Sequence, residues 1–260
     1  MVVFFDIDGT VVDNETQIIP ESAVRAVAQL EKNGHIAVVN TGRPYGHLDP
    51  RIRAMSFSGW ICGCGMELRV GNQWIHKYTP NPEICRHVLD AVHRFGMQAT
   101  LETGDGGLLI DGEYSVHPAI TREVYLLGKK GVEIREVSQG HSIFDKGVSY
   151  DWPGCDREGF LQAMEPYYTC IRRENTMIEF MPLGYSKAQG MADLLAHLGV
   201  DRRDTLAIGD SANDLPMFQA AGHSVCMGDG QEVLKARAEY VTAPVLEDGI
   251  EQALKHFGLI

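Results

Sequence analysis

Residues 1–14 read MVVFFDIDGTVVDN, and this stretch decides the fold. Its apolar run 2–5 is short and rich in β-branched and aromatic residues, which is typical of a strand buried in a parallel sheet. Two carboxylates, Asp6 and Asp8, follow the run directly. Because open α/β sheets bind ligands beyond the carboxyl ends of their strands, the stretch predicts a strand that delivers acidic side chains to a binding site.

Similar apolar runs recur further along the chain, at 36–39, 206–208 and 224–227. Segment 21–33 carries apolar residues at helical spacing and ends before Gly34, so the chain from its start to residue 39 predicts one β-α-β unit. Further short helices are expected at 215–221, 231–238 and 247–257. Strands and helices therefore alternate at both ends of the chain. This alternation predicts an α/β fold whose core is a Rossmann-like, doubly wound parallel sheet.

The middle of the chain has a different pattern. Helical spacing at 83–95 is followed by strand-like segments at 98–102 and 108–111 around the turn GDGG. The later elements are expected as helices at 120–127 and 157–165 and strands at 132–137, 147–152, 170–174 and 177–181. Prolines and glycines mark both borders of this region. We therefore expect a core domain from residues 1–79 and 185–260, with a second, smaller α+β cap domain inserted at 80–184.

Composition disfavours several classes of protein. The formal net charge of -12 argues against nucleic-acid binding, which depends on basic patches. No stretch approaches the roughly 18 apolar residues that span a bilayer, and no signal-peptide pattern opens the sequence, so we expect no membrane partner and a cytoplasmic location. The cysteines lack the paired spacing of a zinc site. Cys62 and Cys64 form a CxC pair that we interpret as two small buried residues, with metal binding or oxidation sensing left open.

Two further strand ends carry polar groups. The run 36–39 continues into Asn40-Thr41-Gly42-Arg43, and the run 206–208 continues into Gly209-Asp210-Ser211-Ala212-Asn213-Asp214. Carboxylates gathered at one edge of a sheet raise one another's pKa unless a cation neutralises them, and hard oxygen ligands suit Mg²⁺. A magnesium ion is therefore implied. Beside it, Asp6 can attack phosphorus to give an aspartyl phosphate, and Asp8 can protonate the leaving alcohol and later deprotonate water.

Taken in order, DxDGT, the strand-end Thr41, Lys187 opening a helix and GDxxND resemble the four motifs of the haloacid dehalogenase superfamily. The resemblance implies that Asp6 is the nucleophile, that Asp8 is the general acid and base, and that Lys187 balances the phosphoryl charge. It implies a phosphate-binding set of Thr41, Gly42, Lys187 and Asn213. The metal ligands that it implies are Asp6, the backbone carbonyl of Asp8, Asp210 and Asp214.

The insert between Thr41 and Lys187 resembles a large type 2 (C2B) cap, and its run of elements is similar to the Cof-type subfamily of sugar and cofactor phosphatases. The resemblance implies that the cap sets substrate specificity. Candidates for reading the leaving group are Arg43 and Glu179, with His117, Arg172 and Arg173 as further cap residues. One departure concerns the segment after the next core strand, where relatives typically read NGA and this chain reads Cys64-Gly65-Met66.

The expected function is Mg²⁺-dependent hydrolysis of a phosphate monoester of a small metabolite, a sugar phosphate or a cofactor phosphate, through an aspartyl phosphate. An aspartate at position 8 favours an ester whose leaving group needs a proton, because phosphate-transferring ATPases of the superfamily resemble DKTGT, with threonine there. Two alternatives stay open: a phosphomutase or phosphotransferase with the same intermediate, and a non-catalytic regulator that binds a phosphate ligand. The expected partner is a small phosphorylated metabolite, and the sequence leaves the oligomeric state open.

Overall fold

Strand β1 (Val2–Phe5) lies inside an eight-stranded sheet in the computed structural model, which describes residues 1–173 and 176–260. The strand order is β14-β13-β12-β1-β2-β3-β4-β5. The other strands are β2 (Ile36–Asn40), β3 (Gly59–Cys62), β4 (Glu67–Val70), β5 (Gln73–Lys77), β12 (Thr205–Gly209), β13 (His223–Cys226) and β14 (Tyr240–Val241). From β14 to β3 each strand runs parallel to its neighbour. This arrangement confirms the predicted α/β fold with a parallel core.

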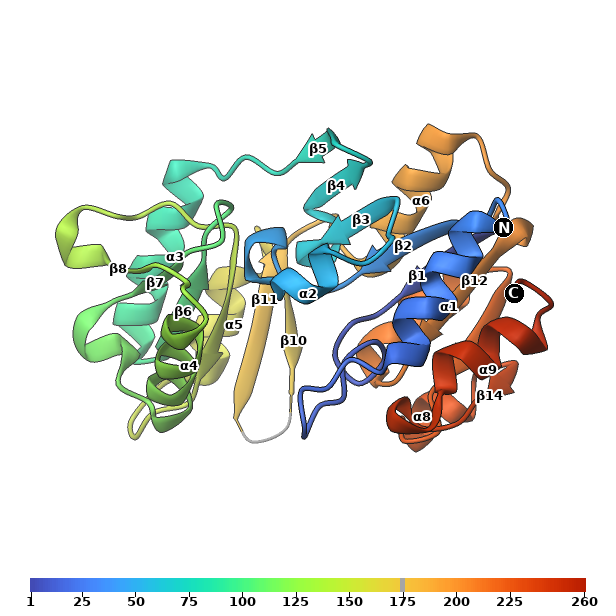
Figure 1. Ribbon diagram of the computed structural model, residues 1–260. Helices are drawn as coiled ribbons and strands as arrows, with labels where there is room; N and C mark the ends of the chain where they lie inside the picture. The colour runs from blue at the N-terminus through green and yellow to red at the C-terminus, as the bar shows by residue number, and fades with distance from the viewer. Residues whose placement is uncertain (174–175) are drawn as a thin grey trace. The chain divides into compact units, whose positions relative to one another are not determined.

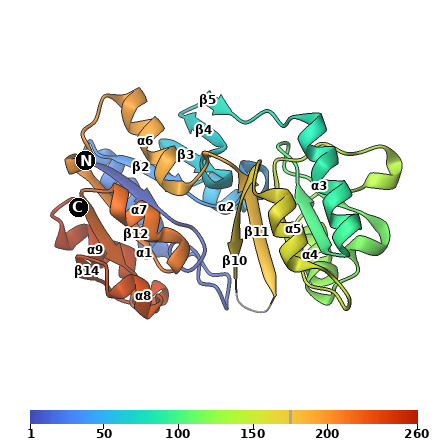
Figure 2. The ribbon, with the colours of Figure 1, turned by 180° about the vertical axis from the view of Figure 1, so that it is seen from behind.

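Helices cover both faces of this sheet. Figures 1 and 2 show α1 and α9 over one face and α6 and α7 over the other. The helices of this part of the chain are α1 (Glu21–Lys32), α2 (Pro50–Arg53), α6 (Lys187–Leu198), α7 (Leu215–Ala220), α8 (Glu232–Lys235) and α9 (Gly249–His256). Because successive strand residues point to opposite faces, Val2 and Phe4 share one face, where they join a buried cluster with Met191 of α6 and Met217 of α7. The sheet is therefore doubly wound, as its strand pattern predicts.

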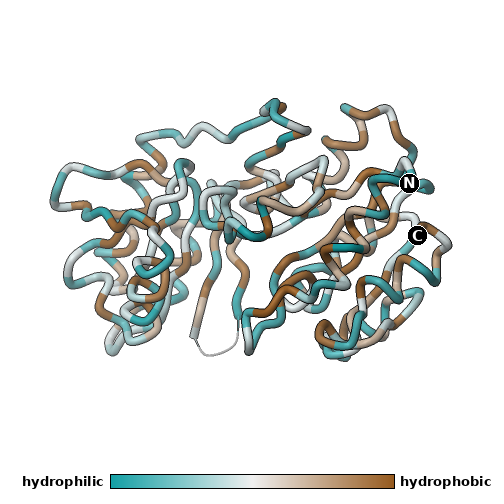
Figure 3. The backbone as a smooth tube through the Cα atoms, in the orientation of Figure 1, coloured by the Kyte–Doolittle hydropathy of each residue, from teal (hydrophilic) through white to brown (hydrophobic). Residues whose placement is uncertain are grey.

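Helix α1 shows how local sequence produces this packing. Its buried residues recur at helical spacing and include Ala23, Val27 and Leu30. Hydrophobic and hydrophilic bands accordingly alternate along α1 in Figure 3. The helix stops at Gly34, whose φ of 85° is a left-handed conformation that glycine adopts without steric cost, and whose N–H donates to the carbonyl of Glu31.

Beyond β3 the sheet continues with two antiparallel strands that the sequence did not predict. A tight turn, Gly63–Gly65, reverses the chain so that Cys62 pairs with Glu67, and β5 then pairs with β4. Most of β5 is exposed, so its residues do not form the continuous apolar run that identifies a buried strand. The parallel core therefore ends in an antiparallel edge.

The chain divides into two units. The first comprises Met1–Arg43, Leu48–Lys77 and Ser186–Ile260, and the second comprises Pro44–His47 and Tyr78–Tyr185. The predicted insert at 80–184 falls within the second unit, which also takes in the short segment Pro44–His47. That this unit acts as a cap that selects substrates stays a prediction.

The second unit has its own sheet, in the order β10-β11-β9-β6-β7-β8. Its elements are α3 (Pro82–Phe95), β6 (Gln98–Glu102), β7 (Leu108–Ile110), α4 (Pro118–Lys129), β8 (Ile134–Glu136), β9 (Lys146–Tyr150), α5 (Arg157–Met164), β10 (Tyr168–Arg172) and β11 (Met177–Pro182). Leu101 and Phe180 of the sheet pack with Val88 of α3 and Phe160 of α5 in a separate buried core. The unit is thus α+β, and of the predicted strand 170–174 the residue Glu174 lies outside the described residues.

The cysteines and the polarity of the helices can be compared with the expectations from composition. The six cysteines are free, and Cys62 and Cys64 are both buried. Among the described residues, no helix combines the length and the apolar character needed to cross a membrane.

Candidate active site

Asp6 stands at the carboxyl end of β1 and is buried, with 3 % of its surface exposed. Its backbone N–H donates to the carbonyl of Ile208 at 3.0 Å, which fixes the end of β1 against β12. Gly9 then turns the chain with a φ of 78°, and a Cβ atom at this position would collide with the carboxylate of Asp210. Only glycine therefore fits at this position beside the Asp210 carboxylate.

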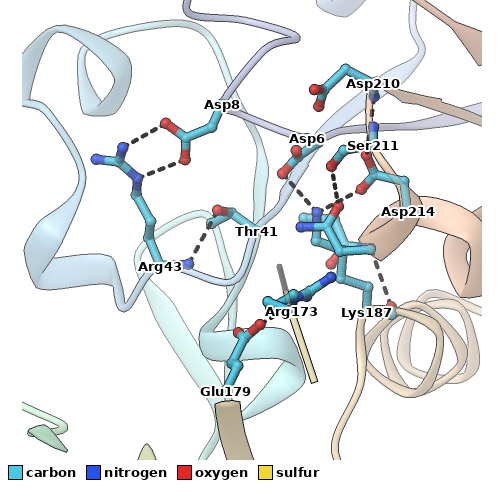
Figure 4. A network of polar contacts seen from close by, with 12 residues as sticks. Asp6, Asp8, Thr41, Arg43, Arg173, Glu179, Lys187, Asp210, Ser211 and Asp214 are labelled. Carbon is cyan, nitrogen blue, oxygen red and sulfur yellow. Dashed lines mark hydrogen bonds and ion pairs between the residues drawn. The ribbon is translucent and has the colours of Figure 1, made fainter. Parts of the chain in front are cut away.

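Lys187 lies between two carboxylates. Its Nζ is 2.7 Å from Oδ1 of Asp6 and 2.6 Å from Oδ1 of Asp214, and all three side chains are at least 95 % buried. Lys187 is the first residue of α6, whose start is capped by the hydroxyl of Ser186, which accepts a hydrogen bond from the N–H of Gln189. Figure 4 shows the ammonium group between the two acids. The start of α6 thus brings a buried cation to the ends of β1 and β12.

Asp214 links this cation to the third strand end. Its Oδ2 accepts hydrogen bonds from the N–H groups of Asp210, at 3.0 Å, and Ser211, at 3.2 Å. Asp214 is fully buried, and a Cβ atom on Gly209 would lie 2.5 Å from the same Oδ2. The turn after β12 therefore closes around the Asp214 carboxylate.

Asn40 holds the other side of α6, a role that the sequence did not predict. Asn40 is the last residue of β2, is completely buried, and donates from Nδ2 to the backbone carbonyl of Lys187 at 3.1 Å. An asparagine that ends a buried apolar strand was the available signal, because a buried amide requires a hydrogen-bond partner. The partner is 147 residues away in the sequence.

Burial and neighbouring charges raise the pKa of two of the aspartates, Asp6 and Asp210. Burial, followed by the charge of Asp214, raises the pKa of Asp6 to about 7 despite the nearby Lys187. Burial and the charges of Asp6 and Asp214 raise the pKa of Asp210 to about 8. Burial alone would lower the pKa of Lys187, but the Asp214 and Asp6 carboxylates raise it well above its usual range, so Lys187 stays charged. Three carboxyl groups thus surround one buried ammonium group, so the site has more acidic groups than Lys187 alone can balance.

A divalent cation fits this deficit. One carboxylate oxygen from each of Asp6, Asp210 and Asp214 lies within 4.8 Å of the others. Oδ1 of Asp210 is buried and has no hydrogen-bond partner among the residues that the structure describes, which is costly for a carboxylate unless a cation takes the place of the missing donor. The donors are all carboxylate oxygens, which is the ligand chemistry of Mg²⁺. The residues present therefore suit the predicted metal.

Asp8 is turned away from Lys187 and contacts Arg43. Nε of Arg43 donates to Oδ2 of Asp8 at 2.7 Å, and Nη2 donates to Oδ1. About a third of each side chain is exposed. Figure 4 shows this pair facing each other on one side of Asp6. The two residues form a two-point ion pair within the first unit.

Thr41, Gly42 and Asn213 follow the ends of β2 and β12 in the first unit. Thr41 is 1 % exposed and its Oγ1 accepts from the N–H of Arg43 at 3.2 Å. Gly42, between them, is half-buried. Asn213 accepts from the hydroxyl of Ser211 at 2.6 Å. Glu179 lies in the second unit, where Nη2 of Arg173 donates to it at 2.8 Å. The structure thus gathers Asp6, Lys187, Asp210 and Asp214 into one network.

Comparison with known proteins finds a family and individual proteins to which this chain is similar. The family haloacid dehalogenase-like hydrolase matches residues 3–254. The protein 5-amino-6-(5-phospho-D-ribitylamino)uracil phosphatase YcsE of Bacillus subtilis (strain 168) is 39 % identical over 256 residues, which cover 98 % of this chain and 94 % of the relative.

Two solved structures have the same fold over at least 95 % of their length. The sugar phosphatase BT4131, of subclass IIB of the superfamily, superposes with a TM-score of 0.80 at 25 % identity and covers 100 % of this chain and 99 % of its own. The phosphatase BT1666 of Bacteroides thetaiotaomicron gives a TM-score of 0.82 at 25 % identity, with 100 % of this chain and 95 % of its own covered.

Proposed function

The chain belongs to the haloacid dehalogenase-like hydrolase family, and on this premise we propose that it hydrolyses phosphate monoesters of small metabolites with Asp6 as the nucleophile. The observation that carries the proposal is the buried network of Asp6, Lys187 and Asp214 beside Asp210. A buried carboxylate held by a cation at a strand end is oriented for attack, and the same cation offsets the charge of the incoming phosphoryl group.

In the first step, a carboxylate oxygen of Asp6 forms a bond to phosphorus while the ester P–O bond breaks, and Asp8 gives its proton to the departing alcohol oxygen. In the second step, water attacks the phosphorus of the aspartyl phosphate and Asp8 takes a proton from that water. The bond from phosphorus to Asp6 breaks, and inorganic phosphate leaves. Both residues return to their starting protonation states, so one ester and one water give one alcohol and one phosphate.

The other site residues bind and balance charge. Lys187 stays positively charged beside Asp6 and compensates the phosphoryl oxygens. Thr41, Gly42 and Asn213 at the neighbouring strand ends are proposed to donate hydrogen bonds to the phosphate. Asp6, Asp210 and Asp214, with the backbone carbonyl of Asp8, would hold a Mg²⁺ ion, which supplies positive charge to the phosphoryl oxygens when bound.

We propose a polyhydroxylated leaving group. The name of the Bacillus subtilis relative places its phosphate on a ribityl chain, and BT4131 is named a sugar phosphatase. Both names describe a phosphate ester on a chain of hydroxylated carbons. An alkyl alcohol of this kind is a poor leaving group, which fits the presence of an acid such as Asp8 beside the nucleophile.

The direct test is release of inorganic phosphate from a panel of sugar, sugar-alcohol, nucleotide and cofactor phosphates, first with Mg²⁺ and then with EDTA. We expect metal-dependent release from the wild-type enzyme and none above background from Asp6→Asn. Asp193→Asn is the matched control, because Asp193 is an exposed aspartate on α6 whose contact is Gln189. Turnover retained by folded Asp6→Asn would refute Asp6 as the nucleophile. In a second assay with an ester whose phosphate is labelled, transfer of the labelled phosphate to a sugar in place of water would show that the enzyme is a transferase.

A further inference from the structure

The contact between Arg43 and Asp8 assigns Arg43 a task other than reading the leaving group. Two donors of one guanidinium, Nε and Nη2, meet the two oxygens of one carboxylate. This fork-to-fork geometry fixes the orientation of a carboxylate as well as its position, which a single-point contact does not. Within the described residues, the hydrogen bonds to the Asp8 carboxylate come from Arg43.

The backbone of Arg43 is itself held on both sides. Its N–H donates to Oγ1 of Thr41, and its carbonyl accepts from the N–H of Gly63 at 2.9 Å. The N–H of Cys64 also donates to the carbonyl of Thr41 at 3.0 Å. The segment that carries Arg43 is therefore tied to the turn that follows β3.

That turn has a demanding backbone. Gly63, Cys64 and Gly65 all have left-handed φ angles, of 58°, 57° and 93°. A cysteine in this conformation costs on the order of 1 kcal/mol, so the surrounding contacts must impose it. Behind the turn, a Cβ on Gly65 would lie 2.8 Å from the carbonyl of Ser186, so the turn also packs directly against the start of α6. The turn that anchors Arg43 is thus packed into the first unit.

Asp8 needs such an anchor. Its backbone is fixed by a bridge to Val12, but its side chain is about a third exposed, and a free aspartate at that exposure samples several rotamers. We propose that Arg43 is a positioning residue that holds the Asp8 carboxylate in the orientation from which it exchanges protons with the leaving group and with water. The inference rests on the proposed function, because it assigns Asp8 the acid and base role.

Positioning and substrate reading have different kinetic signatures. Loss of a residue that positions the acid slows hydrolysis most for esters whose leaving group needs a proton. Loss of a residue that binds the leaving group slows hydrolysis of those esters that carry the groups it contacts. Alkyl and aryl phosphates without hydroxyl groups separate the two, since p-nitrophenolate leaves without a proton and an alkoxide does not.

The experiment measures kcat/KM, which reports the step that breaks the ester bond, for ethyl, phenyl and p-nitrophenyl phosphate. For Arg43→Gln we expect a loss of about tenfold to a hundredfold on ethyl phosphate, the scale of a misplaced catalytic group, and a loss under about threefold on p-nitrophenyl phosphate. Arg43→Lys should lower kcat/KM with the same dependence on the leaving group, but by a smaller factor. Arg51→Gln is the control, because Arg51 makes a comparable two-point pair with Asp49 on the surface.

An equal loss on all three esters, or a rise in KM with an unchanged leaving-group dependence, would overturn the assignment. A second readout does not depend on turnover. In a crystal structure of Arg43→Gln, the Asp8 side chain should occupy more than one rotamer, and an Asp8 carboxylate that keeps its wild-type place would equally overturn it. If the wild-type enzyme releases no phosphate from any ester, the proposed function fails, and the rotamers of Asp8 still decide whether Arg43 positions it.

Discussion

Replacing Lys187 with methionine removes a buried cation that contacts both Asp6 and Asp214 while keeping a side chain of similar length. Its Nζ lies 2.7 Å and 2.6 Å from their carboxylates. Removing one partner of a buried ion pair typically costs about 3–5 kcal/mol, because the remaining charge is left without compensation. Here two carboxylates lose their partner and Asp210 lies beside them. We therefore expect a loss near the upper end of that range at pH 8 in metal-free protein.

The loss should depend on pH in a direction that the pKa values fix. The pKa of Asp6 is raised from 3.8 to about 7, so the folded protein holds a proton that the unfolded chain releases between these values. Stability of the metal-free protein therefore falls as the pH rises from the lower value to the higher one, by about 1.4 kcal/mol for each step of one in pH. The charge of Lys187 lowers the pKa of Asp6 and of Asp210, so without it these two groups hold their protons more strongly. The cost of Lys187→Met should thus be larger at pH 8 than at pH 5.

Urea unfolding followed by circular dichroism at both pH values, in EDTA, measures this difference. The control is Lys255→Met, which removes an exposed lysine paired with Glu251 one helical turn away and should change stability by less than about 0.5 kcal/mol. A cost for Lys187→Met that is equal at pH 5 and pH 8, or no larger than the cost for Lys255→Met, would refute the description of the site as three acids sharing one cation.

Two further outcomes follow from the same structure. The pKa values of Asp6 and Asp210 are raised to about 7 and about 8, so the midpoint temperature of unfolding in EDTA should decrease from pH 5 to pH 8. Added Mg²⁺ should raise this midpoint more at pH 8 than at pH 5. Calorimetric scans in which Mg²⁺ raises the midpoint equally at both pH values would contradict this. Cys64→Val should lower the free energy of unfolding by about 2 kcal/mol more than Cys62→Val does. A β-branched side chain is poorly tolerated at the left-handed φ of Cys64 but suits the extended φ of -117° at Cys62. Equal losses in urea unfolding would show that the turn is not strained.

The parallel core was predictable because its signal is local. A run such as Val2–Phe5 is uniformly apolar since both faces of the strand are buried, and Gly34 ends α1 through its own backbone. Strand β5 was not predicted because most of it is exposed, and β4 (Glu67–Val70) was not predicted because Glu67 and Arg69 interrupt its apolar residues. Strand β3 (Gly59–Cys62) was not predicted from its pattern either, although all four of its residues are buried, because the glycine at its start shortens the apolar run.

The site was predictable in its membership but not in its contacts. Strand ends in a parallel sheet meet at one edge, so Asp6 and Asp210 were expected to be neighbours. The bond from Asn40 to the carbonyl of Lys187 joins residues far apart in sequence, and nothing in either segment specifies it. The pairing of Arg43 with Asp8 likewise joins two segments 35 residues apart. The chemical roles of these residues stay predictions until the enzyme is assayed.

The membership of Pro44–His47 in the second unit changes how the two units can be separated. The backbones of Gly46 and Gly106 touch, since a Cβ on Gly46 would lie 2.7 Å from Cα of Gly106. The polypeptide therefore passes between the units at four places, at Arg43, His47, Lys77 and Tyr185. A chimera that exchanges only residues 78–185 would keep the native segment 44–47 against a foreign loop around position 106. The second unit should therefore be exchanged between relatives most readily when both pieces, 44–47 and 78–185, are moved together.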